Sequence, residues 1–123
     1  TQCLGLRGAT TADANTKAAI VDATKDLLEE LVAANGIAEN DVGAVFFTTT
    51  ADLNAEFPPV ALRVHMGWEQ TALLTSPEIL VPGAHERVIR VMLLVNTERS
   101  KEELVHVYLK GAKNLRARGT QAG

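Results

Sequence analysis

The chain has 123 residues, of which 46% are hydrophobic and only 4% aromatic, and its net charge is −3. This length predicts a single domain spanning residues 1–123 with a mainly aliphatic core, and the dispersed charges exclude nucleic acid as the main partner, because phosphate binding needs clustered basic residues. The absence of a signal-peptide pattern and of an apolar run near the roughly 20 residues that span a bilayer, together with the single cysteine, Cys3, predicts a soluble cytoplasmic protein with no membrane association.

The first half of the chain reads as strand, helix, strand. A strand is predicted over residues 3–11, in which Gly5 and Gly8 permit a bulge or a close backbone approach. A helix follows, capped by Asn15 or Thr16 and ending at Asn35-Gly36. Its apolar residues form one stripe: Ile20, Ala23, Leu27, Leu31 and Ala34. A second strand is predicted over residues 42–50.

The second half is predicted to hold shorter elements. Pro58-Pro59 favours a short helix over residues 60–67, because first-turn amides need no partner. A short strand over residues 71–75 is expected to break at Ser76-Pro77, followed by an extended segment (79–81) and a turn at Pro82-Gly83. Residues 88–95 give the strongest strand signal, which is expected to lie centrally. Residues 100–103 match the capping box of a short helix, a last strand is predicted over residues 105–109, and a flexible tail is predicted over residues 117–123.

This order of elements predicts an α+β fold with a mixed β-sheet, one long helix and one or more short helices. So few helices leave one side of the sheet uncovered. A homo-oligomer that buries this side is therefore expected.

A few polar side chains stand out in apolar segments. Arg90 lies in the run Val-Ile-Arg-Val-Met-Leu-Leu-Val, where a permanent charge must be paired, lie at an edge or face a binding site. Arg7, Glu78, Tyr108 and Arg63 give weaker signals, since each is compatible with an ordinary solvated or half-buried residue. Taken together, several guanidiniums, a phenol and a carboxylate suit a small substrate with two carboxylates and a hydroxyl.

Other chemistries have little support. The three histidines show no metal-ligand spacing, so no metal and no cofactor are expected. The chain has no phosphate-binding loop, dinucleotide fingerprint or nucleophile elbow. His85 or His106 could act as a base for Thr75 or Ser76, but no orienting acid is evident.

From Leu4 to Arg116 the chain resembles the small, trimeric AroH class of monofunctional chorismate mutases. The resemblance is carried by several short motifs in order: Arg7-Gly8-Ala9-Thr10-Thr11, Thr50-Ala51-Asp52-Leu53, Phe57-Pro58, Arg63, Gly67-Trp68, Glu78, Val88-Ile89-Arg90-Val91-Met92, His106-Val107-Tyr108-Leu109 and Leu115-Arg116. It departs from the family pattern at Val60, where a lysine can occur, at Thr75, where a cysteine is seen, and in the tail after Arg116.

The resemblance implies a Bacillus-type chorismate-mutase fold, a homotrimeric pseudo-α/β barrel with three active sites between subunits. It implies an isomerase that converts the small molecule chorismate to prephenate without a cofactor, in phenylalanine and tyrosine biosynthesis. The implied catalytic residues are Arg90 and Glu78. The implied substrate-binding residues are Arg7, Phe57, Arg63, Leu73, Leu74, Thr75, Tyr108, Leu115 and Arg116. Of these, Phe57 and Arg63 are expected from the neighbouring subunit, whereas Arg7, Thr75, Tyr108 and Leu115 accompany the catalytic pair.

In this interpretation Arg90 faces the ether oxygen, where negative charge grows, and Glu78 supports the ring and accepts the hydrogen bond of its hydroxyl. Two alternatives remain at this stage. One is a regulatory trimer that binds a small anion, and the other is an imine deaminase of the trimeric Rid type. The motifs around Arg90 and Glu78 favour the mutase.

Overall fold

The structure is a computed structural model, and it describes residues 1–115. Five strands form one mixed sheet: β1 (Gln2–Thr11), β2 (Val42–Thr49), β3 (Ala72–Pro77), β4 (Val88–Thr97) and β5 (Val107–Tyr108). Their order is β3-β2-β4-β1-β5. The pairs β1–β4 and β2–β4 are antiparallel, whereas β1–β5 and β2–β3 are parallel. The strand with the strongest sequence signal, β4, is central as predicted, because it pairs on both sides.

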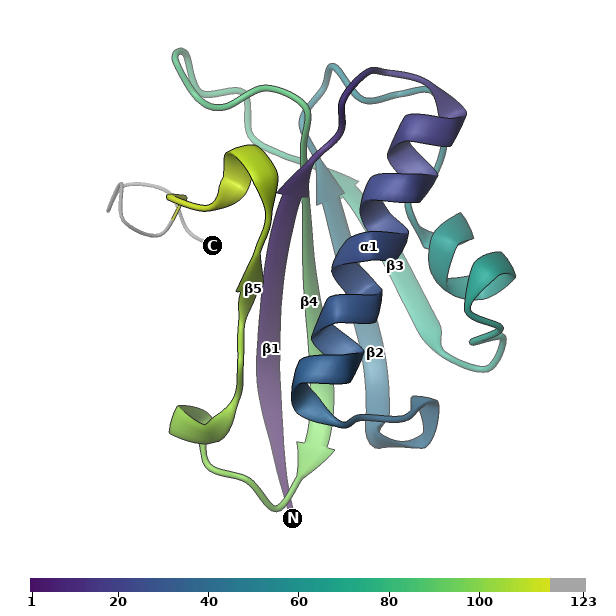
Figure 1. Cartoon of the computed structure of the whole chain (residues 1–123), viewed down its shortest axis with the longest axis vertical. Coiled ribbons are helices and arrows are strands. Elements are labelled where there is room, and N and C mark those ends of the chain that lie inside the picture. Colours follow the sequence, from purple (N-terminus) through teal and green to yellow (C-terminus); the bar gives the residue numbers. More distant parts are fainter. Residues whose placement is uncertain (116–123) are drawn as a thin grey trace.

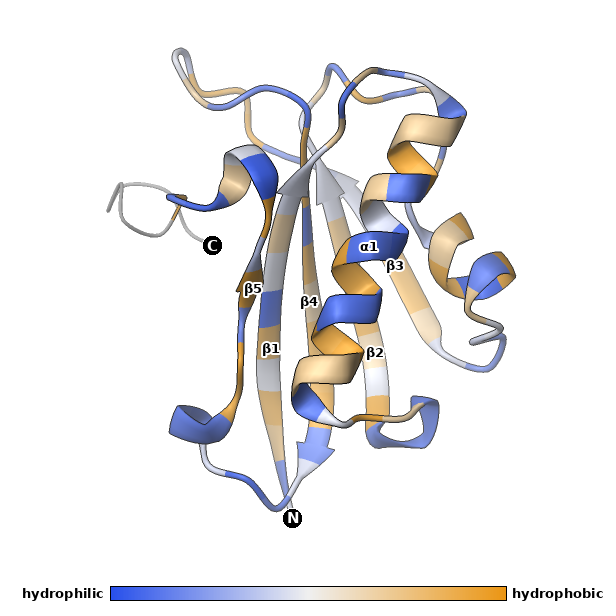
Figure 2. Ribbon diagram, viewed as in Figure 1, coloured by the Kyte–Doolittle hydropathy of each residue, from blue (hydrophilic) through white to orange (hydrophobic). Residues whose placement is uncertain are grey.

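One long helix, α1 (Lys17–Asn35), crosses one face of this sheet (Figure 1). The hydroxyl of Thr16 accepts the Ala19 amide at its start, so Thr16 is the cap, and Gly36 ends it with φ +60°. A short π-helix, η2 (Ala61–His65), packs beside α1, where a short helix was predicted. The buried residues of α1 are mostly apolar, and apolar and polar stretches alternate along its ribbon (Figure 2). Among residues 1–115, no helix has the length and apolar character needed to cross a bilayer.

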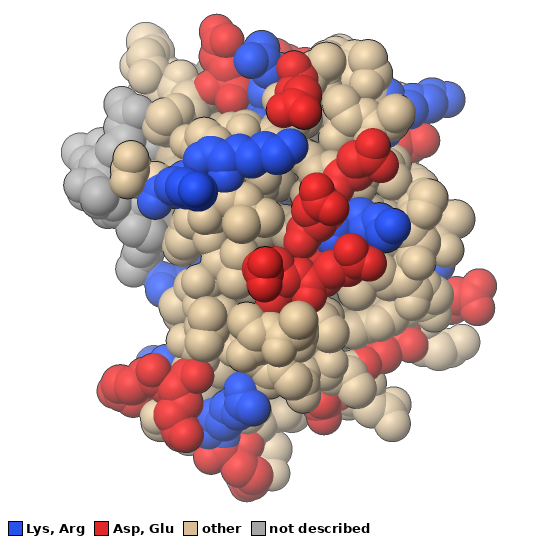
Figure 3. Space-filling view, in the orientation of Figure 1, with Lys and Arg blue, Asp and Glu red and all other residues tan. Residues whose placement is uncertain are grey.

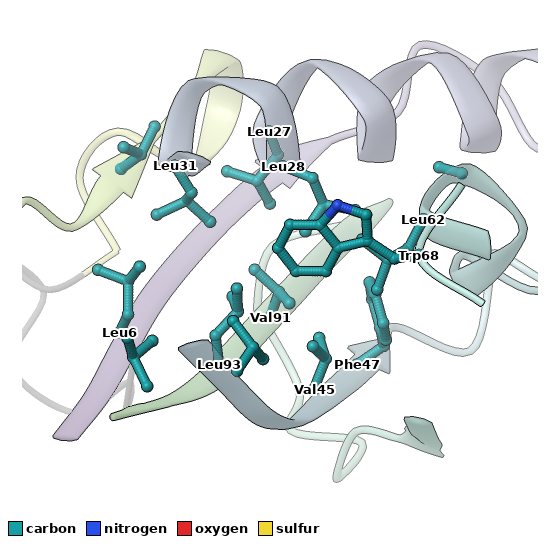
Figure 4. Close-up of a cluster of buried hydrophobic side chains, with 14 of the residues drawn as sticks. Leu6, Leu27, Leu28, Leu31, Val45, Phe47, Leu62, Trp68, Val91 and Leu93 are labelled. Carbon is teal, nitrogen blue, oxygen red and sulfur yellow. The ribbon is translucent and has the colours of Figure 1, made fainter. Parts of the chain in front are cut away.

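The main core lies between α1 and the sheet. Leu27, Leu28 and Leu31 of α1 pack onto inward-facing strand residues, and Leu62 and Trp68 close one side (Figure 4). The strand residues of this layer are buried: Leu6, Val45, Phe47, Val91 and Leu93. Gly8 lets α1 approach, since a Cβ there would lie 2.8 Å from Leu31 Cδ1. This is the close approach that the sequence predicted for Gly8.

The opposite face of the sheet is uncovered in the single chain. Met92 on β4 is 40% exposed and Leu74 on β3 is 61% exposed, and both belong to the face that α1 does not cover. Ile79, Leu80 and Val81, in the loop after β3, are also exposed apolar residues. The prediction of an unburied sheet face is therefore confirmed.

Two predicted strands differ from the observed ones. The predicted break at Ser76-Pro77 is wrong, because β3 continues through both residues and pairs Ser76 with Thr48 and Pro77 with Thr49. Proline is tolerated there since β3 is an edge strand, which needs no donor on its outer side. The last strand, β5, is two residues long instead of five. The backbone of Val105 bonds to the Asn35 side chain instead of to β1, and the His106 imidazole accepts the Arg7 amide in place of a strand carbonyl. Three smaller predictions are confirmed: a turn at Pro82-Gly83, a capping interaction between Ser100 and Glu103, and the 3₁₀ helix η3 (Lys101–Glu103).

Candidate active site

The strands bring three of the predicted residues together on the uncovered face. Arg90 on β4 and Tyr108 on β5 are the partners of Ala9 on the two sides of β1. Arg7 lies two residues before Ala9, so its side chain projects from the same face. Because neighbouring strands are about 4.8 Å apart, the three side chains surround the small side chain of Ala9.

Glu78 joins this group from the loop after β3. Its backbone amide donates to the Thr49 carbonyl (2.9 Å), which continues the pairing of β3 with β2 past Pro77. Its carboxylate oxygen Oε2 lies 2.9 Å from Arg90 Nε, and the Thr48 hydroxyl donates to the same oxygen at 2.8 Å. The side chains of Arg90 and Glu78 are 23% and 17% exposed, so the ion pair is largely sheltered from water.

Within residues 1–115, three buried donor atoms have no hydrogen-bond partner: Arg7 Nε, Arg90 Nε and Tyr108 Oη. Arg90 Nε is within ion-pair distance of Glu78, but its N–H is not directed at the carboxylate oxygen, so it remains available as a donor. Buried polar groups are nearly always hydrogen-bonded. Three such donors around Ala9 therefore indicate a binding site for a ligand rich in acceptor oxygens.

The charge of this group favours an anion. Arg7 and Arg90 contribute two positive charges against the single negative charge of Glu78, and guanidinium groups bind carboxylates with matched geometry. The opposite side of the molecule is less suitable, because acidic side chains gather over α1 (Figure 3). Among the described residues, no three His, Cys, Asp or Glu side chains are grouped as metal ligands.

Leu115 lies at the edge of the group. It is fully buried and packs with Ala9 and Val88, and Tyr108 packs against the same cluster. Its position supports the expected apolar wall. Arg116, which was predicted to lie near the mouth, falls outside the described residues.

The other predicted residues lie elsewhere in the single chain. Phe57 is 69% exposed and borders a hollow that Thr75 also lines, together with Lys17 at the start of α1. Thr75 pairs with the buried Phe47, so its side chain lies on the α1 side of the sheet, opposite to Arg90. The structure thus separates Thr75 from Arg90 and groups it with Phe57, which differs from the expected arrangement.

Arg63, Leu73 and Leu74 are also apart from the Arg90 group. Arg63 is exposed on η2, in the helical layer. Leu73 is half-buried against the main core, whereas Leu74 is exposed at the β3 edge of the uncovered face. One chain alone therefore does not bring these three residues to the Arg90 group.

Two contacts of the site were not predicted from the sequence. Thr48 holds Glu78, and the His106 imidazole accepts the Arg7 amide at 3.0 Å. Strand alternation could have indicated Thr48, because Thr48 follows Phe46 by two residues in the predicted strand (42–50) and therefore lies on the same face of it. No local pattern indicates that His106 bonds to a backbone amide 99 residues away.

Comparisons with known proteins point to one family. The family model described as "Chorismate mutase type I" matches residues 3–118. The chain is 43% identical to "Chorismate mutase AroH" of Thermus thermophilus over 113 residues, which cover 91% of this chain and 92% of that protein. It is 37% identical to "Chorismate mutase AroH" of Bacillus subtilis over 112 residues, which cover 91% of this chain and 88% of that protein. A solved structure, "Chorismate mutase from Clostridium thermocellum", superposes with a TM-score of 0.89 at 49% identity, over 91% of this chain and 99% of that one.

Proposed function

The chain belongs to the type I chorismate mutase family and catalyses the rearrangement of chorismate to prephenate in aromatic amino-acid biosynthesis, and from this premise we propose how its residues carry out the reaction. The observation that carries the proposal is the set of three unpartnered buried donors, Arg7 Nε, Arg90 Nε and Tyr108 Oη, around Ala9. They match a substrate that has two carboxylates, an ether oxygen and a hydroxyl.

The reaction is an intramolecular rearrangement. One carbon–oxygen bond breaks while one carbon–carbon bond forms, and no proton is transferred. The protein therefore contributes by holding the reactive conformer and by stabilising the charge that develops. Negative charge grows on the ether oxygen, and the available Nε–H of Arg90 is the donor that we assign to it.

Glu78 has the complementary role. Arg90 and Thr48 both contact its oxygen Oε2, which fixes the orientation of the carboxylate. We assign the second oxygen, Oε1, to the hydrogen bond from the ring hydroxyl of the substrate. The negative charge of Glu78 then lies beside the ring, where positive character develops in the transition state.

Arg7 and Tyr108 are assigned to the side-chain carboxylate of the substrate. Arg7 supplies a cation and Tyr108 a neutral donor, and both project from the face that carries Arg90. Leu115, next to Ala9, forms an apolar wall. Arg116 is assigned to the mouth, as the family resemblance implies.

We further propose a single domain that functions as a cytoplasmic homotrimer, with each site shared between two subunits. The uncovered face of the sheet and the exposed Phe57 and Arg63 support this arrangement. In it, Phe57, Arg63, Leu74 and Thr75 of one chain approach the Arg90 group of the next. Thr75 is placed on the Phe57 side because the two residues line one hollow.

The experiment that tests this proposal follows the loss of chorismate absorbance on addition of the purified protein. We expect turnover that survives dialysis against a chelator, since the assigned groups need no metal. In Arg7→Ala and Tyr108→Phe variants, KM should rise more than kcat falls, because a carboxylate anchor binds ground state and transition state alike. Unchanged kinetics in both variants would contradict their assignment.

A further inference from the structure

The last strand, β5, begins only at Val107 because the side chain of Asn35 bonds to the backbone of Val105. Asn35, at the end of α1, is only 1% exposed. Its Oδ1 accepts the Val105 amide at 2.8 Å, and its Nδ2 donates to the carbonyls of Val105 and Leu31, each at 2.9 Å. Both backbone groups of Val105 are therefore bonded to the helix end instead of to β1.

This leaves the Arg7 amide without a strand partner. Alternate residues of β1 face β5, as the hydrogen bond from the Leu109 amide to the Ala9 carbonyl shows (2.9 Å). Arg7 is two residues before Ala9, so its amide points to the same side, where a longer strand would offer the Val105 carbonyl. The Nδ1 atom of His106 accepts the Arg7 amide at 3.0 Å instead.

We infer that His106 is a positioning residue for the two substrate-carboxylate ligands, Arg7 and Tyr108. On one side its imidazole fixes the backbone of β1 at Arg7. On the other side it lies two residues before Tyr108, immediately ahead of β5, in which Val107 and Tyr108 pair with β1. Because β5 has only two paired residues, the hydrogen bond between Arg7 and His106 determines how closely the chain just before Tyr108 approaches β1. The inference rests on the proposed roles of Arg7 and Tyr108.

The chemistry of the imidazole gives a clear signature. Nδ1 can accept the amide hydrogen only when it carries no proton, which requires the tautomer with its proton on Nε2. An asparagine places its Oδ1 in the same bonding position relative to Cβ as Nδ1 of histidine, so it can supply the same acceptor. A leucine has the shape of asparagine but has no acceptor.

The test is therefore the matched pair His106→Asn and His106→Leu, measured with chorismate as substrate. Both variants lose every other interaction of the imidazole, so they differ only in the side-chain amide, whose Oδ1 is the acceptor that replaces Nδ1. We expect the Leu variant to raise KM about tenfold with a smaller change in kcat, and the Asn variant to stay within about threefold of wild type, because misplaced ligands weaken binding of the carboxylate. Equal kinetics in the two variants, whether both intact or both impaired, would overturn the inference.

A measurement that does not depend on activity accompanies the kinetics. In ¹⁵N NMR spectra of the wild-type protein, His106 should show an unprotonated Nδ1, and His106→Leu should shift the Arg7 amide more than His106→Asn. A protonated Nδ1 in the folded protein would overturn the inference even if the Leu variant failed to fold. An Arg7→Ala variant with normal kinetics would instead refute the proposed role of Arg7, while the His106 spectra would still report the bond.

Discussion

Glu78 and Arg90 come from different segments of the chain, yet Glu78 Oε2 lies 2.9 Å from Arg90 Nε, and both side chains are largely sheltered from solvent. Arginine–carboxylate pairs usually direct N–H groups at the carboxylate oxygens. Here Arg90 Nε–H is not so directed and has no other acceptor within residues 1–115. The pair therefore holds its charges in place while one donor stays available for the substrate.

The first prediction concerns the support of Glu78. Thr48→Val keeps the shape of the side chain but removes the hydroxyl that donates to Glu78 Oε2. A hydrogen bond to a charged group contributes about 1.5–3 kcal/mol, and Arg90 still holds the same oxygen, so we expect a loss of about tenfold in kcat/KM. Steady-state kinetics of Thr48→Val and of the control Thr48→Ser, which retains the hydroxyl, check this. A Thr48→Ser variant as impaired as Thr48→Val would argue against the hydroxyl as the cause.

A second prediction concerns the shared site. Arg90→Ala chains and Arg63→Ala chains should each be impaired alone. When equal amounts are mixed and exchange subunits, up to about one quarter of the sites should be restored. This fraction follows from random assortment in a trimer in which each site takes Arg90 and Arg63 from different chains. Chorismate turnover before and after mixing measures this. Light scattering coupled to gel filtration should give three times the chain mass. No recovery on mixing would mean that Arg63 and Arg90 serve the site from the same chain.

The third prediction concerns the packing of α1 on the sheet. A Cβ at Gly8 would lie 2.8 Å from Leu31 Cδ1 and 3.1 Å from Leu27 Cδ1. Gly8→Ala should therefore lower the free energy of unfolding by about 1–3 kcal/mol, the usual cost of overpacking a core. Denaturant unfolding of Gly8→Ala beside Gly43→Ala, whose added Cβ meets nothing closer than 3.9 Å, provides the comparison. Equal stabilities of the two variants would contradict the packing account.

Much of the fold could be predicted because local patterns and tertiary structure agree. The apolar stripe of α1, its Thr16 cap and its Gly36 stop are local signals, and the structure confirms them. The apolar run around Arg90 likewise indicated the central strand. The end of β3 was missed because the edge position that makes Pro77 tolerable is a property of the whole sheet. The short β5 was missed because Asn35, which holds Val105, is 70 residues away.

The candidate site was predicted less completely. Family motifs identified Arg7, Glu78, Arg90 and Tyr108, and the structure brings these four together. Periodicity alone could not have joined them, because their proximity depends on the order of the strands. The grouping of Thr75 with Phe57 depends on which side of the sheet each residue faces, which strand register decides and short motifs do not show.

The measurement that tests the central claim most directly is the turnover of Arg90→Ala, in protein shown to be folded and trimeric. Loss of one preorganised donor at the developing charge typically reduces kcat by about 10²–10³, or roughly 3–4 kcal/mol. Arg90→Ala should lose at least that much, chiefly in kcat, and Arg90→Lys should also be severely impaired, because it keeps the charge but loses the planar guanidinium. Arg99→Ala, an exposed arginine beyond the far end of β4, is the matched control and should retain wild-type turnover. A folded, trimeric Arg90→Ala protein with kcat within about threefold of wild type, a difference below about 1 kcal/mol, would contradict the account.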